Sequence, residues 1–266
     1  TAEDLPLPGA TARDGSRVVA TGSHPEYFST SMLNALQTYL DEGGRLMYMG
    51  GNGFYWRVAF DPENPSIIEV RRAEDGTRAW ISEPGEYYHS FTGEYGGMWR
   101  RLGRTPNQLV GVGFSAQGFD GGTYYRLQEG AGDPRVAFLM KGVESPDVIG
   151  NYGTQAGGAA GEEIDRHDVT LGSPEHSVVI ASSEHHKPGM LRVIEETHMM
   201  SVPVDDPKIR ADMVFFETAS GGAVFSTGSI SYAGSLSIND YQNDIETMTR
   251  NVLDRFADDT PFEFPD

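Results

Sequence analysis

The 266-residue sequence contains no cysteine, so disulfide bonds, thiolate metal sites and a cysteine nucleophile are excluded. Positive charge is scarce as well, because 20 Lys and Arg residues stand against 39 Asp and Glu, a formal net charge of −19. A surface with this balance repels phosphate groups, and no basic cluster interrupts it. The composition therefore argues against a nucleic-acid partner.

The sequence also lacks long apolar runs and a secretory signal. A membrane-spanning helix needs about 20 consecutive apolar residues, and the runs here are only a few residues long. The first residues do not combine basic side chains with an apolar stretch, which predicts a cytoplasmic location. The polar opening, residues 1–15, has no initiator Met and is typical of a connector, so we expect the carboxy-terminal part of a longer subunit.

Strand, helix and strand patterns follow one another in the first 50 residues. Residues 17–22 and 46–49 are short apolar or β-branched runs, and Ser29 or Thr30 caps a predicted helix that ends at Gly43. The apolar stripe of this helix consists of Met32, Leu33, Leu36, Tyr39 and Leu40. Short links in this order predict a βαβ unit with parallel strands.

Residues 54–160 have a different character, rich in Tyr, Trp, Gly and Arg with short alternating segments, which predicts an irregular β-rich insertion. Apolar runs return at residues 177–181, 213–217 and 222–226, and an amphipathic helix is expected at about 239–256. These patterns predict a single α/β domain over the whole chain, in which βα units resume after the insertion.

The segment GSHPEY at residues 22–27 follows the first predicted strand and precedes the helix. Open α/β sheets bind ligands at the carboxyl ends of their parallel strands, so this loop is the first candidate site. Pro25 biases His24 towards an extended backbone, and His24 and Glu26 then place an imidazole beside a carboxylate. The alternative is a helix-entry loop in which Glu26 only complements the helix dipole.

The second predicted strand leads into GGNGFYWR at residues 50–57. The glycines allow the backbone to approach a ligand closely, and Asn52 brings an amide that can both donate and accept. Phe54 and Tyr55 are candidates for an apolar substrate pocket. The alternative is a tight turn whose aromatic side chains fill the core. Because both loops follow neighbouring strands, we expect them to converge on one crevice.

Three other motifs are less specific. GEEIDR at residues 161–166 supplies either a buried acid near the site or a surface charge run. The histidines of EHH at 184–186 suggest a metal, but adjacent residues at a strand end point apart. GVGFSA at 111–116 fits a loose dinucleotide pattern without a βαβ context. With no GxSxG elbow and no P-loop, a serine hydrolase and a nucleotidase are disfavoured.

The residue identities in these motifs indicate a family more specifically than their spacing does. GSHPEY at 22–27, GRLMYMGGNGFYWR at 44–57 and GEEIDR at 161–166 resemble the carboxy-terminal part of the N,N-dimethylformamidase large (beta) subunit family. SFTGE at 90–94 and MTRNVLD at 248–254 fit the same family. The resemblance covers nearly the whole chain.

This resemblance implies a fold like that of the class I glutamine amidotransferases, a flavodoxin-like, mostly parallel sheet with helices on both faces. Asn52 stands where those enzymes would place a cysteine, so catalysis by a cysteine nucleophile is excluded. The activity that the family implies is hydrolysis of N,N-dimethylformamide, or a similar small amide, to formate and an amine.

The family also implies a mononuclear Fe³⁺ held by two tyrosinates and one glutamate, all hard oxygen donors suited to a trivalent ion. By motif match, Glu26 is the carboxylate ligand. His24 and Asn52 lie in the substrate pocket as catalytic residues. Glu163, or alternatively Glu162, is the nearby acid or base.

The family's two tyrosine ligands lie upstream of the His-Pro-Glu loop, and no tyrosine precedes Tyr27 in this sequence. We therefore expect the chain alone to bind iron poorly and to have little activity. The expected partners are the upstream part of the same subunit, a small subunit and further copies of the chain. The competing interpretation is a non-catalytic, amidotransferase-like module for binding or assembly.

Overall fold

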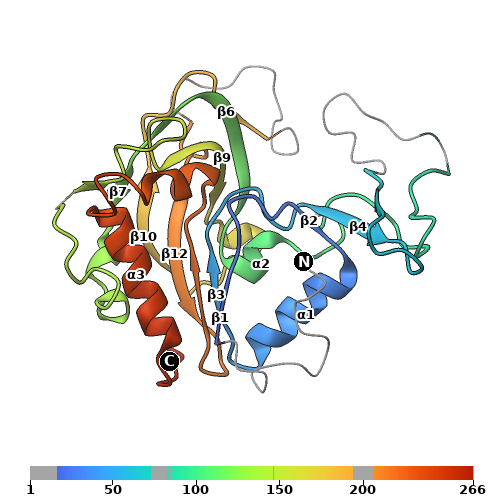
Figure 1. The fold of residues 1–266 in the computed structure, drawn as a ribbon, viewed down its shortest axis with the longest axis horizontal. Coiled ribbons are helices and arrows are strands. Elements are labelled where there is room, and N and C mark those ends of the chain that lie inside the picture. Colours follow the sequence, from blue (N-terminus) through green and yellow to red (C-terminus); the bar gives the residue numbers. More distant parts are fainter. Residues whose placement is uncertain (1–16, 73–82, 84, 146, 194–205, 266) are drawn as a thin grey trace.

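The main sheet has a parallel end and an antiparallel end (Figure 1). The computed structural model describes residues 17–72, 83, 85–145, 147–193 and 206–265. The strand order is β1-β3-β13-β12-β10-β7-β8. The parallel end consists of β1 (Val18–Ala20), β3 (Arg45–Tyr48) and β13 (Ala223–Ser226). The antiparallel end adds β12 (Asp212–Glu217), β10 (Val178–Ser183), β7 (Tyr125–Leu127) and β8 (Val148–Ile149).

The predicted βαβ unit is confirmed. Strands β1 and β3 are parallel neighbours, and α1 (Thr30–Asp41) connects them. Ser29 is the N-cap, and its Oγ accepts a hydrogen bond from the Met32 N–H at 3.3 Å. All five residues of the predicted stripe are buried. Gly43, at φ 89°, follows the helix in the left-handed conformation that glycine tolerates best.

The predicted fold class, a flavodoxin-like and mostly parallel sheet with helices on both faces, is wrong. Residues 218–222 join β12 to β13 as a hairpin in which the Thr218 N–H donates to the Gly222 carbonyl at 2.9 Å. Such a short link makes antiparallel neighbours, since parallel neighbours need a crossover of a dozen or more residues. The sheet is therefore mixed and largely antiparallel.

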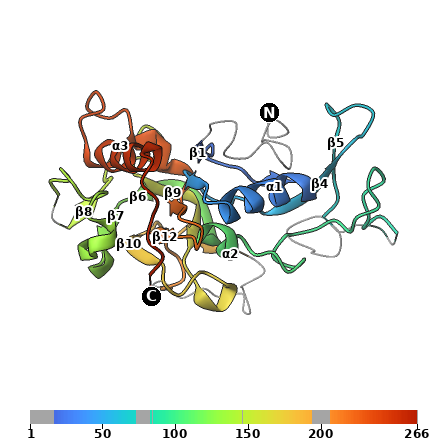
Figure 2. The same cartoon turned by 90° about the horizontal axis from the view of Figure 1, so that it is seen from below.

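In the described part of the chain, one long helix lies on each side of the sheet, rather than the row of crossover helices that a doubly wound fold requires (Figures 1 and 2). In β3, Leu46 and Tyr48 belong to the apolar cluster of α1 and the short helix α2 (Pro106–Val110), whereas Met47 belongs to that of α3 (Asp244–Ala257). This alternation follows from the two-residue period of a strand. The predicted closing helix is thus present, and Asn243 caps it.

Two three-stranded sheets flank the main one. The first has the order β11 (Leu191–Arg192), β6 (Gly113–Thr123), β9 (Ala160–Arg166), and the second β2 (Tyr27–Phe28), β4 (Trp56–Phe60), β5 (Ile68–Val70). Strands β4 and β5 lie at one side of the molecule, beyond α1 and away from α3 (Figures 1 and 2). Short 3₁₀ turns complete the described structure at Glu129–Gly132, Pro134–Val136, Val169–Leu171 and Ile230–Ser235. In the described part of the chain, no helix is long and apolar enough to cross a membrane.

Candidate functional site

The loops after β1 and β3 are joined by backbone hydrogen bonds. The Phe54 N–H donates to the Pro25 carbonyl at 2.8 Å, and the Tyr55 N–H donates to the Glu26 carbonyl at 2.9 Å. Parallel pairing of β2 with β4 continues this contact. The two loops therefore form one unit at the carboxyl ends of neighbouring parallel strands, as their order along the chain leads one to expect.

Strand β9 packs against this unit where glycine leaves room for it. A Cβ at Gly51 would lie 2.4 Å from the Glu163 carbonyl oxygen, and one at Gly53 would lie 2.7 Å from the Tyr48 ring. These glycines thus allow close approach to other parts of the chain. Asn52 between them has a φ of 48°, the left-handed conformation that asparagine adopts more readily than most residues.

The predicted catalytic residues His24, Asn52 and Glu163 meet at this junction. The Asn52 Nδ2 donates to Glu163 Oε2 at 2.8 Å, and His24 Nε2 lies 2.9 Å from the same oxygen. His24 Nε2 is also 3.4 Å from Glu26 Oε2. Glu162, the alternative acid, instead accepts a hydrogen bond from Gln155. The structure therefore brings Glu163, and not Glu162, into contact with His24 and Asn52.

Burial and mutual contact shift the pKa values in this cluster. The hydrogen bond with Glu163 raises the pKa of His24, and burial opposes it only in part. Burial raises the pKa of Glu26, although the nearby His24 works in the other direction. Asn52 and Glu163 are buried, whereas the His24 side chain is 36% exposed. An imidazole shared by two carboxylates, open to solvent on one side, is an arrangement that can hold and transfer a proton.

A second layer lies beneath the cluster and was not singled out in the sequence. Asp165 is fully buried and accepts hydrogen bonds from the Asn52 N–H and from the Tyr48 hydroxyl, both at 2.7 Å. Burial raises the pKa of Asp165 to about 7. The available signal was spacing, because residues 163 and 165 of one strand lie on the same face.

Phe54 and Tyr55, the predicted pocket residues, pack within apolar clusters. The Phe54 ring lies 4.6 Å from Phe28 and 5.5 Å from Tyr48, centroid to centroid. Tyr55 makes edge contacts with Trp56 and Phe114. This packing matches the alternative in which the aromatic side chains fill the core. Contact of either ring with a substrate stays a prediction.

The donor set for a metal is small. Among the described residues, no group of three or more His, Asp and Glu side chains is placed to hold an ion. Glu26 does provide a largely buried carboxylate with a raised pKa. His185 and His186 diverge, since His185 is exposed and His186 Nε2 lies 2.7 Å from Ser183 Oγ. The described residues therefore fit the donation of one carboxylate ligand, from Glu26.

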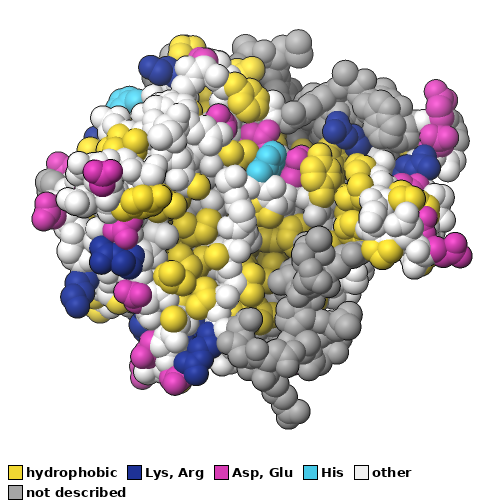
Figure 3. Space-filling model, in the orientation of Figure 1, with side chains coloured by type: hydrophobic (Ala, Val, Ile, Leu, Met, Phe, Trp, Pro, Cys, Tyr) yellow, Lys and Arg dark blue, Asp and Glu magenta, His cyan; other side chains and the backbone are white. Residues whose placement is uncertain are grey.

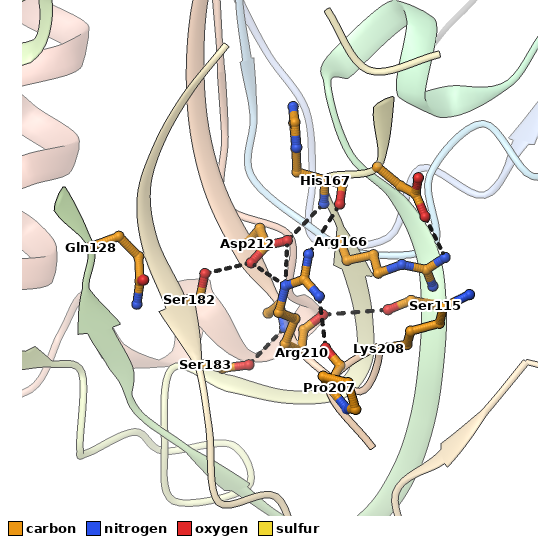
Figure 4. Close-up of polar contacts among 12 residues, drawn as sticks. Ser115, Gln128, Arg166, His167, Ser182, Ser183, Pro207, Lys208, Arg210 and Asp212 are labelled. Atoms are coloured by element: carbon orange, nitrogen blue, oxygen red, sulfur yellow. Dashed lines mark hydrogen bonds and ion pairs between the residues drawn. The ribbon is translucent and has the colours of Figure 1, made fainter. Parts of the chain in front are cut away.

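A separate polar cluster surrounds Asp212 (Figure 4). Its buried carboxylate accepts hydrogen bonds from Ser182 Oγ at 2.6 Å, the His167 N–H at 2.8 Å and Arg210 Nε at 2.9 Å. These bonds satisfy the carboxylate and tie β12 to β10 and to the end of β9, which is the pattern of a structural cluster.

On the face in Figure 3, the described Lys and Arg side chains occur in small separate groups.

Comparison with known proteins identifies the family. The family model described as N,N-dimethylformamidase beta subunit-like, C-terminal, matches residues 1–243. The chain belongs to this family. It is 42% identical, over 265 residues, to the N,N-dimethylformamidase beta subunits of Alcaligenes sp and of Paracoccus aminophilus. The match covers 98% of this chain and 34% of each relative, so the chain spans about a third of their length.

A weaker likeness links the chain to a solved structure, the mmIFT52 N-terminal domain. The TM-score is 0.42 at 11% sequence identity, with 96% of this chain and 80% of that chain covered. Similarity at this level supports no conclusion about fold or function.

Proposed function

We propose that this chain provides part of the active site of an amide hydrolase of the N,N-dimethylformamidase type. The observation that carries the proposal is the contact of His24 and Asn52 with Glu163, next to Glu26, in a chain that belongs to this family. The proposed substrate is N,N-dimethylformamide or a similar small amide, hydrolysed at its C–N bond to formate and an amine.

In the proposed reaction, Glu163 is the general base and then the general acid. Its carboxylate takes a proton from the attacking water and passes it to the nitrogen as the C–N bond breaks, so that the amine leaves neutral. Asn52 Nδ2 and a protonated His24 donate hydrogen bonds to the carbonyl oxygen, where negative charge develops during attack. The raised pKa of His24 favours the protonated form for this role.

The proposed cofactor of the complete subunit is iron. Glu26 would hold it from this chain, together with two tyrosinates from outside it, and a bound ferric ion would supply Lewis-acid polarisation of the amide carbonyl. We further propose that the upstream part of the subunit, a small subunit and other copies of the chain are partners. The words "beta subunit" in the relatives' names support an association with other subunits.

The test uses the complete subunit, with its upstream sequence, as wild type and as Glu26→Ala. Elemental analysis measures iron, and release of formate is followed with N,N-dimethylformamide and a panel of other formamides and acetamides. We expect stoichiometric iron and formate release in the wild type, and loss of both in a folded Glu26→Ala protein. A folded wild type without iron or amidase activity would instead favour a binding or assembly module.

A further inference from the structure

Asp165 links the two halves of the candidate site. Its Oδ1 accepts the Asn52 N–H at 2.7 Å, and its Oδ2 accepts the Tyr48 hydroxyl at 2.7 Å. The Tyr48 oxygen in turn accepts the Gly53 N–H, also at 2.7 Å. One carboxylate thus fixes two consecutive backbone N–H groups of the turn, one directly and one through Tyr48.

We infer that Asp165 is a positioning residue that sets the Asn52 amide against Glu163, an inference that rests on the proposed function. Asp165 and Glu163 lie two residues apart on β9, so they share a face and are rigidly spaced. By binding the backbone of Asn52, Asp165 fixes the turn relative to the strand that carries Glu163.

The side chain of Asn52 depends on its backbone for its position. Within the described residues, Asn52 Oδ1 has no hydrogen-bond partner, and Nδ2 is the atom that contacts Glu163 and His24. The turn carries backbone strain at Phe54, a bulky residue with a positive φ of 55°. The hydrogen bonds that Asp165 accepts from the Asn52 N–H and the Tyr48 hydroxyl therefore help to hold this conformation.

The experiment compares Asp165→Ala with Asp165→Asn and with Asp212→Ala in the complete subunit. Asp212 is a matched control, since it is equally buried but accepts hydrogen bonds from Ser182, His167 and Arg210 (Figure 4) and not from the Asn52 turn. The measurements are kcat and KM for amide hydrolysis, thermal stability, and hydrogen exchange of a peptide that covers residues 48–55.

We expect both alanine variants to lose stability, but only Asp165→Ala to lower kcat, by about 10- to 100-fold with little change in KM, the cost of misplacing a catalytic group by about 1 Å. Asp165→Asn keeps an acceptor for the Asn52 N–H and should retain most of the activity. Hydrogen exchange of residues 48–55 should accelerate in Asp165→Ala and not in Asp212→Ala.

An unchanged kcat in Asp165→Ala, or an equal loss in Asp212→Ala, would overturn the inference. If the wild type hydrolyses no amide, the proposed function fails. Hydrogen exchange of residues 48–55 then tests by itself whether Asp165 positions the turn. Faster exchange at residues 48–55 only in Asp165→Ala would still support positioning of the turn, and equal exchange in the two variants would contradict it.

Discussion

At the scale of single residues, two neighbouring glutamates differ in what they can do. Glu163 contacts His24 and Asn52, whereas Glu162 has a φ of 62° and bonds Gln155 at an exposed site. The sequence left both open, because the choice depends on how β9 lies against the loops after β1 and β3. That arrangement is non-local, and the motif alone does not contain it.

Glu163→Gln in the complete subunit should lower kcat by about 100- to 1,000-fold, since a glutamine cannot carry a proton and general acid–base catalysis contributes on this scale. Glu162→Gln is the matched control and should keep wild-type kcat. Steady-state formate release measures both. A large loss in Glu162→Gln with activity retained in Glu163→Gln would reverse the assignment.

Asn52→Ala should lower kcat while iron content stays at the wild-type level. The substitution removes the amide that donates to Glu163 but leaves Glu26 in place. Asn52 also sits at a positive φ, so alanine adds backbone strain, and thermal stability should be measured beside activity. Loss of iron together with activity would show that Asn52 supports the metal ligand rather than the reaction.

At the scale of elements, the predictions succeeded where the signals are local. The Ser29 cap, the apolar stripe of α1 and the glycine stop lie within 16 residues of one another, and the structure has all three. The Asp165–Tyr48–Asn52 contacts instead join β9 to a turn more than 100 residues earlier. Their distances depend on sheet assembly, which periodicity in one segment does not reveal.

The turn at residues 50–53 provides a test of element packing. In Gly51→Ala, the new Cβ would lie 2.4 Å from the Glu163 carbonyl oxygen, so the turn or β9 must move. We expect a loss of about 1–3 kcal/mol in the free energy of unfolding, typical of overpacking, together with reduced activity. Gly22→Ala is the control, because a Cβ there has nothing within 4 Å. Denaturant unfolding of both variants measures the difference, and equal stabilities would contradict the close approach.

At the scale of the whole molecule, the predicted fold failed at its strand connections. The apolar runs that became β10, β12 and β13 were placed correctly, but βα units were expected to resume there. The link between β12 and β13 permits only a hairpin, so these two strands are antiparallel. Counting the residues between the two runs would have indicated this.

Stability as a function of pH tests the buried carboxylate of Asp165. Burial raises the pKa of Asp165 from 3.8 to about 7, so between these values the folded state holds a proton that the unfolded state has released. The contribution of Asp165 to the free energy of unfolding must therefore fall as pH rises from about 4 to about 7, and stay level above that.

Asp165→Asn removes this titration, and the difference in stability between wild type and variant should shrink across that pH window. Asp168→Asn is a control in which the pKa of the native carboxyl is shifted in the opposite direction. Burial would raise the pKa of Asp168, but hydrogen bonds from Thr170 and Arg166 outweigh it and lower the pKa to about 2. Its stabilisation is therefore present above pH 4 and is lost as pH falls towards 2. Denaturant unfolding from pH 2 to pH 8 measures all three proteins, and parallel curves for wild type and Asp165→Asn between pH 4 and pH 7 would contradict a protonated Asp165 in the folded chain.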